Sequence, residues 1–280
     1  MHILRILLTI TLALIPYTSN AGNIIKCKDR AGNTVFTQNS TDCENSTEDL
    51  SSTLVSTKKN NKKVNYRFPT RAYISERGRW NIYVEKSMKM GNPNLYVSSL
   101  EKLNETLDYA FSSMPANARK KLSNINIFLL WGKASPLGGR ISGMNYVRKG
   151  QPNHNYHLDR RWEHALIVYS AENLIYLSKL WSRKAIFHEL SHAWHIVNWP
   201  EKHPPIYEAW KSAKNTQKFI GVLDIKGKAI KSAYARKNQL EYFAELSAMY
   251  FVGGNYYPFN KVGLKKYDLQ GYKMVEMLWN

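Results

Sequence analysis

The chain has 280 residues, of which 44% are hydrophobic and 12% are aromatic. This composition excludes a protein that is disordered throughout, because it supplies enough apolar surface for one large domain or two modest ones. The formal net charge of +19 favours anionic partners such as envelope phosphates, nucleic acids or acidic proteins, without choosing among them.

Residues 1–21 have the pattern of a secretory signal peptide. Arg5 precedes the apolar run ILLTITLALI, Pro16 ends that run, and small residues follow up to Ala21. The run is too short to span a bilayer, which needs about 20 apolar residues, and no later segment is long and apolar enough. We therefore expect an exported protein, either periplasmic or secreted. An uncleaved membrane anchor is the alternative.

Residues 22–44 predict a small disulfide-bonded β-hairpin. The runs NIIKCK and NTVFTQ are strand-like, and Gly32 and Asn33 between them favour the positive φ angles of a hairpin turn. In an exported protein Cys27 and Cys43 predict one disulfide, with two free thiols as the alternative. The segment resembles a hairpin module at the mature N-termini of many proteobacterial envelope proteins, which implies a Gram-negative source.

Residues 45–65 are rich in Ser, Thr, Asn and Lys, and they predict a flexible linker because they cannot bury enough apolar surface to offset chain entropy. The globular domain is expected at residues 66–280. The patterning within it predicts strands at 79–87, 125–132 and 164–170 and helices at 95–114, 178–197 and 238–252. Residues 132–162 predict a loop or irregular strands. This order of elements indicates an α+β fold.

The segment AIFHELSHAWH, residues 185–195, contains a candidate metal site. On a helix, His188 and His192 project from one face with Cβ atoms about 5–6 Å apart. Two imidazoles at this spacing can bind one tetrahedral zinc ion, and Glu189 beside them can take a proton from metal-bound water. A buried helix whose histidines are satisfied by hydrogen bonds is the alternative. We expect His195, one turn further along, to be a packing or partly exposed residue.

A catalytic zinc ion needs a third protein ligand. The longer motif that ends in a third histidine is absent, because Asn198 stands at that position. In the helix at 238–252, Glu241 and Glu245 lie four residues apart on one face, so that one can bind the metal and the other can orient a ligand histidine. Asn238 and Glu241 also match a capping box, which would compete for the same carboxylate. We expect the metal to prevail or the helix to begin earlier.

These motifs together resemble the anthrax lethal factor-like branch of glutamate-ligand zinc metallopeptidases, the gluzincins. Glu241 of EYFAE follows His192 of HELSH by 49 residues, and Tyr234 precedes Glu241 by seven within YARKNQLEYFAELSAMYF. The resemblance covers roughly residues 165–259. It implies a zincin-like metallopeptidase domain, with a mixed sheet, an active-site helix and a helical C-terminal part.

The resemblance implies one Zn²⁺ per chain, bound by His188, His192 and Glu241. Glu189 would be the general base, and Tyr234 would direct its hydroxyl to the substrate carbonyl. The alternative for Tyr234 is a packing or surface residue. Glu245 would be the carboxylate that orients a ligand histidine, with a plain surface charge as the alternative.

We therefore expect a monomeric, exported zinc endopeptidase that acts on a peptide or protein substrate. The alternative is a zincin-fold protein, non-catalytic or toxin-like, that binds anionic envelope components through its basic surface. The chain has no recognisable nucleic-acid-binding motif, so a solvated lysine-rich surface is favoured over a nucleic-acid site. Residues 164–170 are the candidate edge strand for an extended substrate. His154 and His157 are expected to be solvated, with substrate contact as the alternative.

Overall fold

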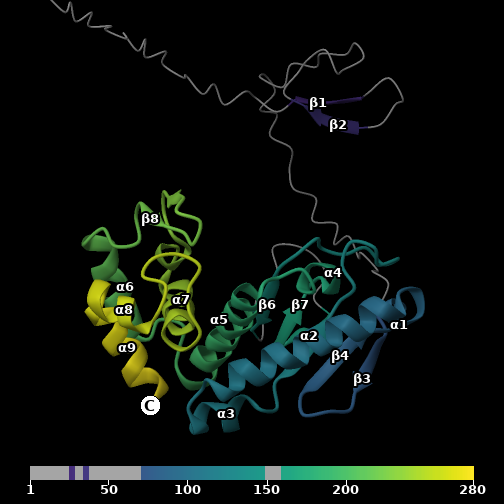
Figure 1. The fold of residues 1–280 in the computed structure, drawn as a ribbon, viewed down its shortest axis with the longest axis horizontal. Coiled ribbons are helices and arrows are strands. Elements are labelled where there is room, and N and C mark those ends of the chain that lie inside the picture. Colours follow the sequence, from purple (N-terminus) through teal and green to yellow (C-terminus); the bar gives the residue numbers. More distant parts are fainter. Residues whose placement is uncertain (1–24, 29–33, 38–70, 149–158) are drawn as a thin grey trace, which may run out of the picture. The chain divides into compact units, whose positions relative to one another are not determined.

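The computed structural model describes residues 25–28, 34–37, 71–148 and 159–280 (Figure 1). The chain divides into two compact units, Met1–Asn65 and Tyr66–Asn280. In the first unit, strands β1 (Ile25–Lys28) and β2 (Thr34–Thr37) pair antiparallel, as predicted for the hairpin.

Several predictions concern parts of the chain outside the described residues. These are the signal peptide at 1–21, the linker at 45–65, and the loop histidines His154 and His157. Cys43 and the side chain of Cys27 also lie outside them, so the disulfide stays a prediction.

The second unit contains a mixed five-stranded sheet. Its strands, in spatial order, are β3 (Tyr73–Glu76), β4 (Asn81–Glu85), β5 (Asn126–Leu129), β7 (Ala165–Val168) and β6 (Met144–Val147). The three central strands are parallel, and β3 and β6 each pair antiparallel with a neighbour. The strands predicted at 79–87, 125–132 and 164–170 are therefore present, although each is shorter than predicted.

The prediction that residues 164–170 form an edge strand is wrong. β7 lies between β5 and β6, and all four of its residues are buried. A continuous apolar run such as ALIV is typical of a strand covered on both faces. The edge is β6 instead, which comes from the stretch predicted as loop or irregular strands and which packs beside helix α5.

Nine α-helices lie in the described part of the second unit. They are α1 (Lys86–Gly91), α2 (Pro93–Ser112), α3 (Ala116–Leu122), α4 (Ala171–Leu174), α5 (Lys179–Asn198), α6 (Pro204–Asn215), α7 (Gln239–Phe251), α8 (Lys261–Tyr267) and α9 (Leu269–Trp279). Two 3₁₀ turns, η2 (Arg160–Trp162) and η3 (Tyr234–Arg236), and a hairpin of β8 (Val222–Leu223) and β9 (Ala229–Ile230) complete these elements. Together with the mixed sheet they form an α+β fold, as predicted.

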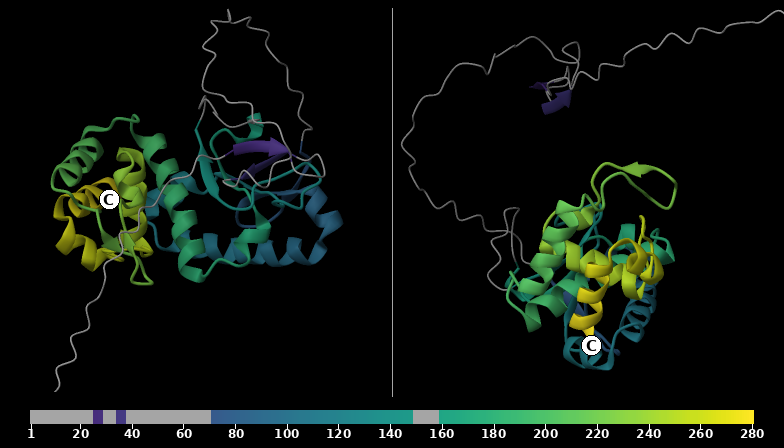
Figure 2. Two further views of the ribbon diagram at one scale, coloured as in Figure 1. Left: turned by 90° about the horizontal axis from the view of Figure 1, so that it is seen from above. Right: turned by 90° about the vertical axis from the view of Figure 1, so that its left-hand side faces the viewer.

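Helix α5 lies between the two parts of this unit (Figures 1 and 2). On one side are the sheet and α2, whose predicted apolar stripe of Leu103, Leu107 and Phe111 is buried. On the other side are α6, α7, α8 and α9. Among the described residues, no helix has the length and apolar character needed to cross a membrane.

The penultimate residue packs against both helices that carry the predicted ligands. Trp279 is fully buried, and its ring lies 5.4 Å from that of Trp194 on α5 and 6.2 Å from that of Phe243 on α7. Its Nε1 donates a hydrogen bond to Ser247 Oγ of α7 over 2.9 Å. The C-terminal helix thus fixes the spacing of α5 and α7.

Replacing Trp279 with alanine should therefore destabilise the whole second unit. Removing a buried tryptophan costs about 3–5 kcal/mol, which should lower the thermal unfolding midpoint by roughly 6–20 °C. The control is Met277→Ala, which truncates an exposed side chain of the same helix. Calorimetry of both variants checks the prediction, and equal midpoints for the two would contradict it.

Candidate metal centre

The two motif histidines and the downstream glutamate meet at one point. His188 Nε2 and His192 Nε2 are 3.1 Å apart, and each lies 3.1 Å from Glu241 Oε2. His188 is buried, and the other two side chains are partly buried. The structure thus brings together the three residues that the sequence proposes as ligands, and this cluster could hold a metal ion.

The donor triangle has the size that a tetrahedral ion requires. Donors on a zinc ion with bonds of about 2.0–2.1 Å lie about 3.3 Å apart, close to the 3.1 Å edges of this triangle. Three atoms of this kind occupy one face of a tetrahedron, which leaves a fourth position for water or substrate. Two imidazoles and one carboxylate also form a donor set that suits zinc.

The start of α7 resolves the expected competition for Glu241. Asn238 is the N-cap residue, and its side-chain oxygen accepts a hydrogen bond from the backbone N–H of Glu241 over 2.9 Å. The cap therefore uses only the amide of Glu241, while its carboxylate faces the histidines of α5. The helix begins where predicted, and capping and ligand presentation use different groups of one residue.

Glu245 lies behind the cluster, on the α7 face predicted for it. Its Oε1 is 2.9 Å from His188 Nδ1, the ring nitrogen that faces away from the donor triangle. A carboxylate there favours the tautomer with a proton on Nδ1 and a lone pair on Nε2. Glu245 is thus placed where it can orient His188 toward the ion position.

Lys184 was missed by the sequence analysis. Its ammonium group lies 2.9 Å from Glu245 Oε1, and both side chains are buried. Lys184 precedes His188 by four residues, so its position on the same face of α5 is a signal that the sequence contains. That a lysine would be buried there, opposite a carboxylate of another helix, becomes evident only when α5 and α7 are packed together.

The electrostatics of the cluster favour ionised carboxylates. Burial raises the pKa of Glu245, but Lys184 and the ring of His188 outweigh this effect and hold the pKa at about 2. Burial also raises the pKa of Glu241, and the two imidazoles outweigh it, so that its pKa lies well below the usual range. Burial lowers the pKa of His188, but the two carboxylates outweigh it and raise the pKa to about 10. Both carboxylates are therefore ionised at neutral pH.

Tyr234 lies beside the cluster, and its side chain is about half exposed. Its hydroxyl donates to Glu241 Oε1 over 3.0 Å, so it lies beside the ion position, as the sequence spacing suggests. Lys237 is a second residue that the sequence analysis missed. Its Nζ lies 2.9 Å from the Tyr234 hydroxyl and 3.1 Å from Glu241 Oε1. The i, i+4 spacing of Lys237 and Glu241 is the sequence signal for this contact.

Glu189 is attached to the edge of the sheet. Its Oε2 accepts a hydrogen bond from the backbone N–H of Tyr146 in β6 over 2.7 Å. Next to it an open pocket reaches the cluster. The pocket is lined by Asn145, Tyr146, Arg148, His192, Ile196, Leu240 and Glu241. The candidate metal centre therefore opens toward solvent between β6, α5 and α7.

His195 is a packing residue, as predicted. It is fully buried, its ring lies 5.6 Å from that of Phe243, and its Nε2 donates to the carbonyl oxygen of Pro200 over 3.1 Å. Burial lowers its pKa to about 4, so the ring is neutral at neutral pH. His195 faces away from the donor triangle and is not one of the residues that form it.

Comparison with known proteins gives no relative. No protein-family model, curated protein or solved structure matches the chain. The resemblance to gluzincins therefore rests on the motif residues of the sequence alone.

We expect the purified chain to retain one zinc ion. Alanine at His192 or Glu241 removes one of three ligands, so either variant should retain none after gel filtration at micromolar concentration. His203→Ala is the control, because it removes a histidine outside the cluster. Elemental analysis measures the zinc. A wild-type chain without zinc, or a His192→Ala variant that retains it, would rule out the cluster as a metal site.

We also expect Lys184 to support the fold through Glu245. Lys184→Met leaves a buried carboxylate without its partner, which should cost about 3–5 kcal/mol in denaturant unfolding. Adding Glu245→Leu should recover part of this stability, because no buried charge of this pair then remains. The zinc affinity of the double variant should be lower than that of the wild type, because His188 loses the carboxylate beside its Nδ1. The control is Lys179→Met at an exposed position of α5. If Lys184→Met unfolds like this control, the buried pair does not support the fold.

Proposed function

We propose that this chain is a zinc-dependent endopeptidase with a zincin-type active site, related to the lethal factor-like gluzincins. The observation that supports it most directly is the triangle of donor atoms with 3.1 Å edges from His188, His192 and Glu241. Three protein ligands and an open fourth position are typical of catalytic rather than structural zinc sites. When bound, zinc would polarise a peptide carbonyl and lower the pKa of water.

Glu189 would be the general base. Its carboxylate follows the first ligand directly in sequence, and its Oε2 is held by the Tyr146 N–H. It would take a proton from the attacking water and deliver it to the amide nitrogen that leaves. A fixed carboxylate at this place reduces the reorganisation needed for each transfer.

Tyr234 would stabilise the negative charge that develops on the carbonyl oxygen. Its hydroxyl donates to the outer oxygen of Glu241 and accepts from the Lys237 ammonium group. During the reaction the hydroxyl hydrogen would turn from Glu241 to the carbonyl oxygen of the substrate. A donor that faces the reacting carbonyl lowers the barrier because it binds the oxyanion more strongly than the ground state. Glu245 would keep His188 oriented throughout the reaction.

The edge strand β6 offers a place for an extended substrate. The N–H of Tyr169 donates to the carbonyl of Gly143, and alternation along an antiparallel pair then directs the backbone groups of Met144 and Tyr146 away from β7. The Tyr146 N–H contacts Glu189, in agreement with this direction. A peptide would add to the remaining outward groups of β6 and pass beside the cluster.

This arrangement favours an enzyme over a purely binding protein. A metal-binding cluster alone would not require the carboxylate of Glu189, next to a ligand in sequence, and the hydroxyl of Tyr234, in contact with Glu241. The signal-peptide pattern makes export to the periplasm or the medium part of the proposal, with a peptide or protein as substrate.

The zinc-loaded wild type should cleave members of a mixed peptide library, as followed by mass spectrometry. Glu189→Gln should lower the cleavage rate by about 10²–10⁴-fold while zinc is retained, since it removes only the base. Tyr234→Phe should lower it by about 10²–10³-fold through loss of one oxyanion donor. Tyr176→Phe, at a highly exposed tyrosine, is the control. A wild type that binds zinc but cleaves nothing, or a fully active Glu189→Gln variant, contradicts the peptidase proposal.

A further inference from the structure

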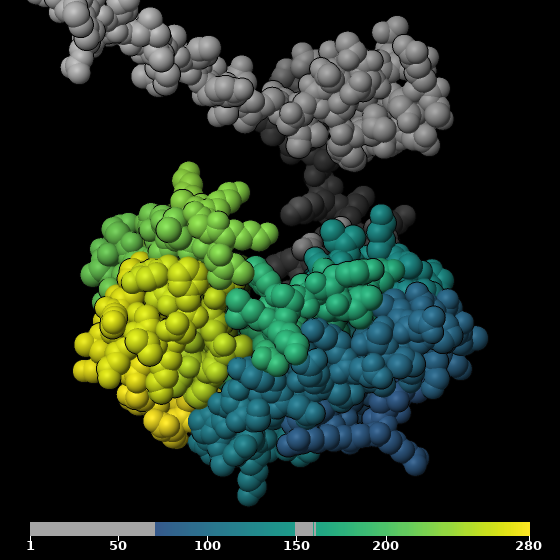
Figure 3. Space-filling model, in the orientation of Figure 1, coloured from purple at the N-terminus to yellow at the C-terminus, as the bar shows by residue number. Residues whose placement is uncertain are grey.

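The hairpin of β8 and β9 projects from the helical part of the second unit (Figures 1 and 2). Its base is fixed where the Ala233 N–H donates to the Phe219 carbonyl over 2.9 Å, and Phe219 itself is fully buried. We call residues 219–233 the projecting hairpin. In the space-filling view its side chains rise above the surrounding surface (Figure 3).

One face of the projecting hairpin is apolar and exposed. Val222 of β8 is buried, while Leu223, the next residue of β8, and Ile225, in the turn that follows, are 51% and 47% exposed. Tyr257 adds a ring that is 39% exposed, and its N–H donates to the Leu223 carbonyl over 2.8 Å. The antiparallel bridge between Asp224 and Tyr256 places Tyr257 opposite Leu223, so both side chains share this face.

Lysines flank these apolar side chains. Lys226, Lys228 and Lys231 are all exposed. Asp224 is the acidic residue of the projecting hairpin, and its Oδ1 accepts the backbone N–H groups of Lys226 and Lys228 over 2.8 and 2.9 Å. This aspartate therefore shapes the turn, and the projecting hairpin carries three exposed lysines together with its exposed apolar side chains.

We propose that the projecting hairpin docks on the surface of an anionic phospholipid bilayer. Apolar side chains next to lysines match the boundary between acyl chains and phosphate headgroups. There the apolar side chains enter the acyl region and the lysines contact the phosphates. The cores of protein–protein interfaces are depleted in lysine, so this composition fits a protein partner less well. A nucleic acid would match the lysines but would leave Leu223 and Ile225 without a partner.

Vesicle sedimentation with the full, zinc-loaded chain tests the proposal independently of peptidase activity. The vesicles contain phosphatidylcholine with or without 40% phosphatidylglycerol. Because the whole chain is basic, part of any binding to anionic vesicles is expected to be unspecific. The informative comparison is therefore between hairpin variants and variants elsewhere that remove the same number of charged or apolar side chains.

Lys226→Gln/Lys228→Gln should weaken binding to the anionic vesicles about 25-fold, since each lysine near such a surface contributes about fivefold. The matched control is Lys265→Gln/Lys266→Gln, at two exposed lysines of α8. This control should change binding by less than threefold, because only screened long-range attraction is lost.

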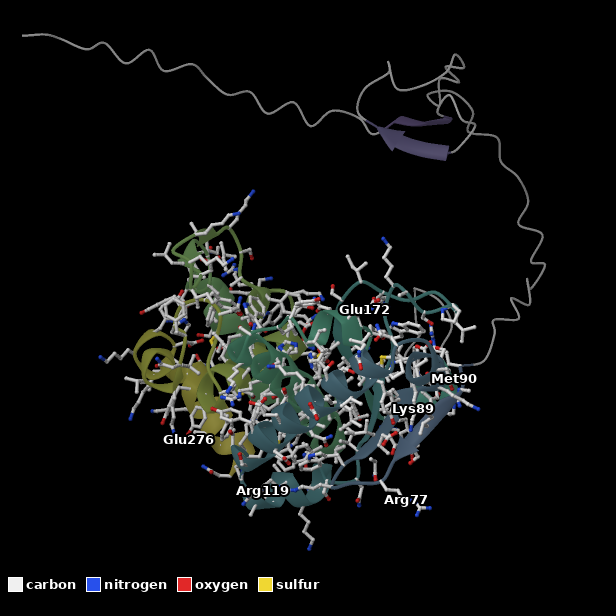
Figure 4. The ribbon with its side chains drawn as sticks, turned by 45° about the vertical axis from the view of Figure 1, so that its right-hand side comes forward. Arg77, Lys89, Met90, Arg119, Glu172 and Glu276 are labelled. Carbon is white, nitrogen blue, oxygen red and sulfur yellow. The ribbon has the colours of Figure 1, made fainter. Side chains whose placement is uncertain are left out.

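Leu223→Ser/Ile225→Ser should weaken binding at least tenfold, because it removes the apolar contacts with the bilayer. It should also abolish the part of the binding that persists in 0.5 M NaCl, where the screening length for exposed charges is about 4 Å. The matched control is Met90→Ser/Val97→Ser, which removes side chains that are 74% and 51% exposed. Met90 lies on α1 and is labelled in Figure 4. This control should bind like the wild type.

All four double variants should have the circular dichroism spectrum of the wild type, because the replaced side chains are exposed. Equal losses in hairpin variants and controls would overturn the proposal, as would a wild type that does not bind. Duplex DNA serves as a competing ligand. If DNA is bound more tightly than vesicles, and if this binding falls with the lysine variant but not with the apolar one, the hairpin binds nucleic acid instead.

Discussion

The packing of α5 against α7 is the constraint on which the candidate site depends. Two imidazoles from α5 and one carboxylate from α7 meet at 3.1 Å only if the two helices keep their spacing and rotation. Buried aromatic rings, with Trp279 among them, hold that spacing. The sheet constrains the site as well, because the Tyr146 N–H at the outer edge of β6 holds the carboxylate of Glu189. Three separate elements therefore contribute to one small volume, and their hydrophobic packing fixes its geometry.

The charges around the site form two layers. The inner layer consists of two imidazoles and the carboxylate of Glu241, and the outer layer places Lys184 on one side and Lys237 on the other, each in contact with a glutamate. Burying a carboxylate without a partner is costly, so the buried lysine allows Glu245 to remain ionised beside His188. In this way α5 supplies both a ligand and the counter-charge for the residue that orients it.

Much of the site could be predicted from the sequence because its residues repeat with helical period. The four-residue spacings of His188 with His192 and of Glu241 with Glu245 define faces without knowledge of the tertiary structure. Contacts between elements could not be predicted in this way. That β6, and not the predicted β7, is the edge strand beside α5 depends on the strand order of the sheet, which local patterning does not encode. Likewise, the pairing of Lys184 with Glu245 depends on how two helices pack. The zincin relationship and the cleavage of peptides remain proposals based on the motif and its geometry.

With an ion bound as proposed, the two uses of Glu241 would link metal supply to the lifetime of the protein. Its amide completes the first turn of α7, and its carboxylate faces the histidines of α5. A ligand that binds only the native state stabilises it in proportion to the logarithm of its concentration. Chelation of the ion would therefore lower stability as well as activity. The first turn of α7 would open more often, and proteases would gain access to backbone that the bound ion had kept closed.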